Sequence, residues 1–371
     1  MENLSKRLWP LRHYLIPLAV FGLFFAGVMT VAAERGRNPV QEILLTKKWD
    51  INHYKTITTD GYIIYECTGR KGYNKGEICG NPGWWPGWPV IAKPLYLLTG
   101  DVHFTYAFLA VTFSLAAFIL IFHLVLTQWG LLSACFGTAS LACFPGSFYL
   151  LTGFPYAFLL TVLLLYILLF KNRYAAFVLA FIAGVSYPSA VLFALYPTAI
   201  LIKKVIAKDF NPRSCADIIV FRILPFALGP LAFFTYFWIT QGDLMLHMRF
   251  QSQPRYARSW SWPWEAVWTH LRSRKGAHAE TVSFLSAMFA LALFGTRRLG
   301  AGLWTVTAGL VLLSPSTGSL LSVFRHYLIV FPLHMLVGIS SRPWIIKLLF
   351  LVVMASLNRQ FILTFVYGRL V

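Results

Sequence analysis

Long apolar runs separated by polar segments dominate the pattern along this chain. The first run, Leu15 to Ala33, is long enough for a helix that crosses a bilayer, which needs about 20 residues. Further apolar runs follow at about 104–126, 130–151, 155–170, 174–202, 218–240, 281–296, 300–314, 323–340 and 343–366. The pattern predicts an all-α polytopic membrane protein, a single domain over residues 1–371 with about eleven membrane helices.

The apolar run around Pro188 is counted as two of these helices. The basic stretch "KNR" (171–173) precedes this run, and "KKVIAK" (203–208) follows it. Because positive residues favour the cytoplasmic side, both ends of the run are expected there. We therefore predict two short helices that enter the membrane and return, with the basic segments at 296–298 and 340–342 on the same side.

Two long polar segments, 34–103 and 241–279, then fall on the outer face. The first contains "NPGWWPGWPVIAKPLYLLTGD", where proline and glycine prevent one regular helix. Short interfacial helices joined by turns are expected, with Trp84, Trp85 and Trp88 at the membrane–water interface. The basic N-terminus before Leu15 predicts an uncleaved first helix that starts in the cytoplasm.

Composition supports a membrane protein and excludes a nucleic-acid partner. The chain is 58% hydrophobic and only 12% charged, whereas soluble domains are about one-quarter charged. Its formal net charge of +19 comes from short Lys and Arg clusters between apolar runs. Membrane topology and lipid headgroups account for such clusters, and no basic soluble domain is present.

Cysteines give a prediction about the first polar segment. Cys67 and Cys79 both lie in it, so an extracytoplasmic location favours a disulfide between them, and two free thiols are the alternative. No second Cys or His pair stands at zinc-ligand spacing.

Carboxylates avoid the predicted spans, which disfavours a proton or cation relay through the membrane. No internal repeat of the kind found in secondary transporters is visible. The acidic residues concentrate in the first polar segment, at Glu34, Glu42, Asp50, Asp60, Glu66, Glu77 and Asp101.

Asp50 stands out within "KKWDINHYKTITTDGY" (47–62). If this stretch is helical, Trp49, His53 and Ile57 share one face, and Asp50 shares another with Tyr54. A carboxylate near the membrane surface and beside aromatic rings fits a general base. A helix N-cap or a solvated loop acid is the alternative interpretation.

Several motifs resemble one enzyme family when taken in order. "KKWDINHYKTITTDGY" and "WWPGWPVIAKPLY" are similar to its W-D-x-x-H/W-Y and F-F-P-L-Y-P signatures. "TGFPYAFLL" with the following "GVSYPSA" resembles its F-P-Y-S-E-S and T-R-P-x-G block, and "SVFRHYLIVFP" resembles its late R-Y and F-P segment. The chain thus resembles the PIG-V-like family (GPI mannosyltransferase II type) of the GT-C membrane glycosyltransferases, as a prokaryotic relative.

The resemblance has departures that concern the substrates more than the reaction type. The family's Ser-Glu after F-P-Y is Ala157 and Phe158 here, and its Thr-Arg-Pro is Ser186, Tyr187 and Pro188. Two polar positions are therefore lost. The identity of the sugar and of the acceptor is accordingly left open.

The resemblance implies a GT-C fold and an inverting transfer, in the first instance of mannose, from a polyprenyl- or dolichyl-phosphate donor. Asp50 is the expected base, and Arg325, with His326 and Tyr327, is expected to meet the donor phosphate. A snorkelling arginine is the alternative interpretation of Arg325. Further candidate substrate contacts are His53, Tyr54, Trp84, Trp85, His103, Arg255 and Arg258.

The expected acceptor is a glycan, lipid or protein, with membrane lipids as the surroundings. The second polar segment either covers the lipid-linked donor or rests on headgroups. The expected location is the cytoplasmic membrane of a prokaryote with the site on the outer face, or the endoplasmic reticulum membrane with a lumenal site in a eukaryote.

Nothing in the sequence requires a cofactor. There is no D-x-D pair near Asp50, no P-loop and no dinucleotide-binding fingerprint, so a nucleotide-sugar donor is disfavoured. A divalent metal at Asp50 stays open. Two rival functions are a transporter or flippase of a lipid-linked substrate and a catalytically inactive membrane subunit.

Overall fold

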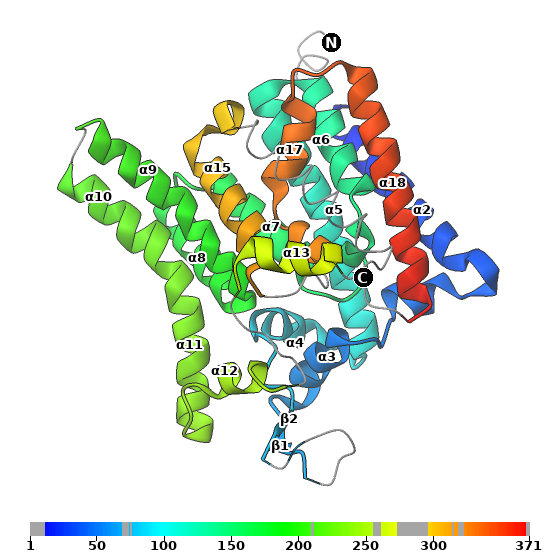
Figure 1. The fold of residues 1–371 in the computed structure, drawn as a ribbon, viewed down its shortest axis with the longest axis vertical. Coiled ribbons are helices and arrows are strands. Elements are labelled where there is room, and N and C mark those ends of the chain that lie inside the picture. The colour runs from blue at the N-terminus through cyan, green and yellow to red at the C-terminus, as the bar shows by residue number, and fades with distance from the viewer. Residues whose placement is uncertain are drawn as a thin grey trace.

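A computed structural model describes residues 12–68, 74, 76–208, 211–254, 261–272, 296–313, 315–317 and 323–368. Its described part is mostly helical (Figure 1). The N-terminal half contains α2 (Leu15–Ala33), η1 (Glu34–Gly36), η2 (Val40–Leu44), α3 (Asp50–Asp60), β1 (Ile64–Glu66), β2 (Ile78–Gly80), α4 (Gly87–Thr99), α5 (Val102–Trp129), α6 (Leu131–Cys143), η3 (Ser147–Leu150), α7 (Tyr156–Leu168) and α8 (Arg173–Ser186). The C-terminal half contains η4 (Pro188–Ala194), α9 (Leu195–Ile206), α10 (Pro212–Ile218), η5 (Ile219–Ile223), α11 (Leu224–Gln241), α12 (Leu246–Gln251), α13 (Pro263–Arg272), α15 (Thr296–Leu313), η6 (Pro315–Thr317), α16 (Val323–Tyr327), α17 (Phe331–Ile339) and α18 (Trp344–Val366).

Five helical segments of the described chain are long and apolar enough to cross a membrane: 15–33, 102–129, 188–206, 212–241 and 344–366. Most residues of each segment are not buried inside the protein, although their side chains are apolar. Lipid is the solvent that suits such surfaces. The chain is therefore an all-α membrane protein, as its sequence pattern predicts. The predicted run at 281–296 lies almost entirely outside the described residues.

The predicted break in the run around Pro188 is confirmed. α8 ends at Ser186, Tyr187 is extended, and η4 begins with Pro188. The first residue of α8, Arg173, lies 4.0 Å from Asp217 in α10, and α10 follows α9 after a short connection. The two segments thus start and finish at the same end of the bundle, as expected for helices that enter and return.

The predicted single span at 323–340 is wrong. It is divided into the five-residue α16 and the nine-residue α17, with residues 328–330 between them. Pro332 stands in the first turn of α17, where it cannot donate to the preceding turn and its ring disfavours a continuous helix. Because of this break, the axis of α16, which carries Arg325, is not an extension of the α17 axis.

The first polar segment forms the lower end of the molecule in Figure 1, where α3, α4 and the β1–β2 hairpin lie together. The two strands pair antiparallel, with Tyr65 opposite Cys79. Short helices were expected in this segment, but the hairpin was not. Trp84, Trp85 and Trp88, which are expected at the membrane–water interface, are all buried in the protein. The Trp88 indole donates a hydrogen bond to the Gly153 carbonyl over 2.9 Å, which fixes α4 against the α7 side.

Cys67 and Cys79 form a disulfide that closes this hairpin, in agreement with the sequence prediction. Their Cα atoms lie 5.2 Å apart. Such a bond is typical of an oxidising compartment. Cys135, Cys143 and Cys215 are free thiols.

Reduction of this disulfide is expected to lower the melting temperature, because closing a loop of this length stabilises a fold by about 3 kcal/mol. Thiol titration of denatured, unreduced protein should count three of the five cysteines. A Cys67→Ser/Cys79→Ser variant should melt at the reduced protein's temperature and be insensitive to reductant. A count of five thiols contradicts the bond.

Candidate functional site

Asp50 and Arg325, 275 positions apart in the sequence, meet in an ion pair. The Nη1 atom of Arg325 lies 3.0 Å from Oδ2 of Asp50. The arginine side chain is 6% exposed and the carboxylate 31% exposed, so one partner is buried and the other reaches solvent. Within the part of the chain that the structure describes, Arg325 is the one partner of the Asp50 carboxylate. The two residues that the sequence assigns to opposite roles are therefore in direct contact.

The backbone just before Asp50 is held in an unusual conformation. Trp49 has a φ of +52°, a region that costs a non-glycine residue roughly 1–3 kcal/mol. Its ring packs 5.0 Å from that of Phe365 at the end of α18. Beside it, the Lys48 ammonium donates hydrogen bonds to the Phe365 and Val366 carbonyls and pairs with Glu42 over 2.5 Å. These contacts explain why the chain turns sharply and α3 begins at Asp50.

The start of α3 also corrects one sequence prediction. Trp49 precedes the helix, so it does not share a helical face with His53 and Ile57. Asp50 occupies the first helical position, where a negative charge favours the helix N-terminus. Tyr54, one turn later, is buried beside Asp50, as predicted for positions four residues apart.

Tyrosines from separate elements surround the ion pair. Tyr149 in η3, Tyr156 at the start of α7 and Tyr187 just after α8 lie near Arg325. The Tyr156 and Tyr187 hydroxyls are 2.9 Å apart in a hydrogen bond. The Arg325 guanidinium also lies over the Phe154 ring at 5.4 Å. The result is a polar site walled by aromatic rings.

Tyr54 contributes a neutral hydroxyl to this site. Burial raises the pKa of Tyr54 well above its ordinary value, and the neighbouring Tyr187 and Asp50 add to the rise. The phenol therefore keeps its proton at physiological pH. It is available as a hydrogen-bond donor next to the ion pair rather than as a base.

A second buried arginine shows what is unusual about Arg325. Arg222 and its partner Asp217 have nearly the same exposures, 9% and 30%. However, the Nε atom of Arg222 donates to the Phe170 carbonyl, and its other nitrogens donate to Asp217 and to the Lys171 carbonyl. In Arg325, Nε and Nη1 are buried, and neither donates a hydrogen bond within the described chain; Nη1 contacts Asp50 outside hydrogen-bond geometry. Buried charged donors are normally satisfied, so Arg325 is poised for an additional acceptor.

His326 lies at the same site and Tyr327 does not. The His326 ring is 6.3 Å from that of Tyr156 and 6.1 Å from that of Tyr187. The Tyr327 hydroxyl instead donates to the Val311 carbonyl in α15 over 2.8 Å. Because successive residues of a helix point about 100° apart, Arg325 and Tyr327 face different directions. The prediction that Tyr327 binds with Arg325 is therefore wrong.

Other predicted contacts are divided among three places. His53 stacks on Trp84 with ring centroids 3.5 Å apart, one turn of α3 from Asp50. Trp85 packs instead against Phe233 in a separate apolar cluster. His103 lies 2.8 Å from the buried Lys55 amine, whose pKa is lowered by burial to about 8. Neither Trp85 nor His103 shows a contact with the Asp50–Arg325 pair. Arg255 and Arg258 lie outside the described residues.

Sequence reasoning missed the surrounding tyrosines as site residues. Tyr156 and Tyr187 lie within quoted motifs, "FPY" and "SYP", while Tyr149 lies in "SFYLL" just before them. Tyr156 follows Pro155 and Tyr187 precedes Pro188, each at a helix end, and Tyr149 lies in the short helix η3. An accumulation of tyrosines at such junctions was the available signal.

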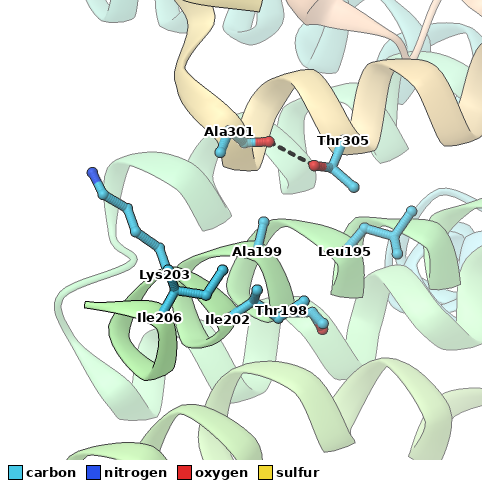
Figure 2. A pocket seen from close by; sticks show the side chains of 8 residues that line it. All are labelled: Leu195, Thr198, Ala199, Ile202, Lys203, Ile206, Ala301 and Thr305. Atoms are coloured by element: carbon cyan, nitrogen blue, oxygen red, sulfur yellow. Dashed lines mark hydrogen bonds between the residues drawn. The ribbon is translucent and has the colours of Figure 1, made fainter. Parts of the chain in front are cut away.

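A cavity of about 390 Å³ between α9 and α15 is lined by no carboxylate (Figure 2). Its two threonine hydroxyls are turned onto backbone carbonyls, Thr305 onto Ala301 and Thr198 onto Ala194. The described residues contain no cluster of three or more His, Cys, Asp or Glu side chains arranged to hold a metal ion.

Comparison with known proteins adds no family assignment: no protein-family model and no curated protein matches the chain.

Proposed function

We propose that this protein is an inverting GT-C glycosyltransferase that moves a sugar, in the first instance mannose, from a lipid-phosphate donor to an acceptor hydroxyl. The observation that carries the proposal is the Asp50–Arg325 pair with its incompletely hydrogen-bonded guanidinium. The Asp50 carboxylate reaches solvent, where it can accept the proton of an acceptor hydroxyl. The buried Arg325 has N–H groups without hydrogen-bond acceptors in the described chain, which can bind the phosphate of the donor.

The order of the resembling motifs gives independent support. The segments with Asp50, with Phe154 and Tyr156, with Tyr187, and with Arg325 are far apart in the sequence but meet at one site. Tyr187 stands where the family pattern has arginine. A phenol there supplies a neutral hydrogen-bond donor in place of a second cation, so Arg325 is the main counter-charge for the phosphate in this proposal.

The proposed mechanism assigns one role to each side of the ion pair. Asp50 accepts the proton of the acceptor hydroxyl, and that oxygen attacks the anomeric carbon. The bond from the anomeric carbon to the phosphate oxygen breaks, and its electron pair leaves with the lipid phosphate. Arg325 stabilises the growing negative charge, and Tyr54 and His326 line the same space. Because attack and departure occur on opposite faces of the sugar, the anomeric configuration is inverted.

An apolar cavity beside α3 supports a lipid-linked substrate. It has a volume of about 560 Å³ and is lined by α3, α4, α8 and α11. Its walls include Ile57, Val90 and Phe233, and Lys93 lies at its edge, held by the Thr58 and Thr59 carbonyls. Asp60 lines it as well. In this proposal the largely apolar space holds the lipid chain of the donor, while the phosphate lies at Arg325. Its nearest lining residue on α3, Ile57, lies seven positions after Asp50, or about 10 Å along the helix.

We also propose the finer topology: about eleven membrane helices, with residues 34–103 and 241–279 on the outer face of a prokaryotic cytoplasmic membrane. The basic segments near 171–173, 203–208 and 296–298 support a cytoplasmic side opposite α3. The Cys67–Cys79 disulfide supports an oxidising outer side for the first polar segment.

A donor panel tests the proposal directly. Purified protein in lipid vesicles is incubated with polyprenyl-phosphate mannose, glucose, galactose and arabinose, and release of free lipid phosphate is measured. One donor should release phosphate in an acceptor-dependent manner, and Asp50→Asn protein should release almost none. If wild type and the Asp50→Asn variant release the same amount of lipid phosphate from every donor, the proposed enzymatic activity is contradicted and an inactive subunit is favoured. Movement of an intact donor across the vesicle favours the flippase.

A further inference from the structure

Helix α13 exposes a stripe of tryptophan that the proposed reaction does not use. Trp264 is 62% exposed and Trp268 is 56% exposed, and Trp262, just before the helix, stacks on Trp264 with centroids 4.9 Å apart. Exposed clusters of large apolar rings mark interaction surfaces. The neighbouring Arg272 guanidinium lies over the Trp268 ring at 4.8 Å.

The residues of α13 are divided into three faces. At 100° per residue, Trp264 and Trp268 lie about 40° apart and form one face. Glu265 and Thr269, both exposed, follow on the next face. Ala266, which is buried in the main core, and Val267, which packs against that core, occupy the remaining side. The helix thus has a protein side, an aromatic side and a polar side, with the aromatic and polar sides adjacent.

α13 is fixed to the bundle in a crosswise orientation. Its axis runs crosswise to those of α15 and α18 in Figure 1, and it packs against η6. The Ser261 amide donates to the Ser316 carbonyl of η6 over 3.0 Å, which ties the start of α13 to the segment that leads to Arg325. The Trp262 amide donates to the Glu265 carboxylate over 3.0 Å, one half of a capping box.

We infer that α13 lies in the headgroup layer of the bilayer, with Trp264 and Trp268 inserted among phospholipids and Glu265 and Thr269 in water. A helix that lies crosswise on a bundle of membrane spans, in the headgroup layer, contacts protein, lipid and water. The protein, aromatic and polar sides of α13 suit these three surroundings respectively. Tryptophan is stable in that layer because the ring is apolar and its N–H remains able to bond. Arg272 adds a cation suited to lipid phosphate.

Spin labels on adjacent residues test this orientation independently of any enzymatic activity. In a background with Cys135, Cys143 and Cys215 replaced by alanine and the Cys67–Cys79 disulfide retained, nitroxides are attached after Trp268→Cys or Thr269→Cys. The protein is placed in phosphatidylcholine–phosphatidylglycerol vesicles. Collision of the label with apolar oxygen and with a water-soluble nickel complex is then measured.

The oxygen-to-nickel collision ratio should be several-fold higher at position 268 than at position 269, although the two positions are neighbours. A label attached after Ala266→Cys should be protected from both reagents, which controls for folding. Equal access of nickel to 268 and 269 overturns the inference and indicates an aqueous surface, such as one that binds a glycan. Protection of both positions from both reagents overturns it too, and indicates a protein partner.

Discussion

Replacing Asp50 by asparagine is expected to lower turnover by about 10²- to 10⁴-fold, the usual contribution of a general base. Asparagine is nearly isosteric and still offers an oxygen to Arg325, but it does not accept the acceptor's proton. Donor binding should change little, because the Arg325 cation remains in place. The measurements are initial rates of lipid-phosphate release and donor affinity in vesicles, together with the melting temperature of the variant.

Glu66→Gln is the matched control for this experiment. Glu66 is an exposed carboxylate in β1 of the same polar segment and lies outside the ion pair and the cavity beside α3, so its replacement removes one negative charge away from both. Turnover of the Glu66 variant should stay close to wild type. Retention of more than about a tenth of wild-type turnover by Asp50→Asn is incompatible with its role as the base. An equal loss in the Glu66 variant would show that the loss follows from the missing charge rather than from the missing base.

Replacing Arg325 by alanine is expected to lower kcat by about 10²- to 10³-fold, the usual loss when one donor to a developing oxyanion is removed. Unlike Asp50→Asn, it should also raise KM for the donor, since the phosphate is charged before and during transfer. Arg325→Lys keeps the charge but loses the planar fork, so its activity should be intermediate. Initial rates over a range of donor concentrations separate the two parameters.

Replacing Arg325 also removes one member of the ion pair and so lowers the stability of the fold. The effect on stability must therefore be separated from the effect on activity. Removing one member of a buried pair is costly, and removing both together is much less so. The Asp50→Asn/Arg325→Met double variant should therefore recover part of the stability lost in Arg325→Met, but none of the activity. Recovery of activity together with stability would show a purely structural ion pair.

The Asp217–Arg222 pair controls for this comparison because its exposures are nearly identical. Arg222→Met should lower the melting temperature at least as much as Arg325→Met, since more hydrogen bonds are lost. Relative to the amount of folded protein, its donor KM should stay near that of wild type. A similar rise in donor KM for both variants would contradict a specific role for Arg325.

Local pattern was sufficient to predict several of the helices and part of the site. Leu15–Ala33 is a helix because a run of about 20 apolar residues is stable as a helix in lipid, where each backbone group must be bonded internally. The break at Pro188 follows from proline's missing N–H. The helical position of Asp50 beside Tyr54 follows from the 3.6-residue period. These properties depend on residues close in sequence.

Long-range packing decided what such patterns do not contain. Trp85 packs away from the site, and Tyr327 faces α15. Neither follows from a local period, because each depends on which distant side chain fills the neighbouring space.

The sequence by itself determined that this is a helical membrane protein, and it indicated Asp50 and Arg325 as two separate candidate residues. Only the tertiary structure decided that they touch, that Tyr149, Tyr156 and Tyr187 enclose them, and that Arg325 keeps donors unbonded within the described chain where Arg222 does not. The physical reason is that hydrogen bonding and burial of a charge are set by atoms brought together from several helices. The sequence lists those atoms but does not state their distances.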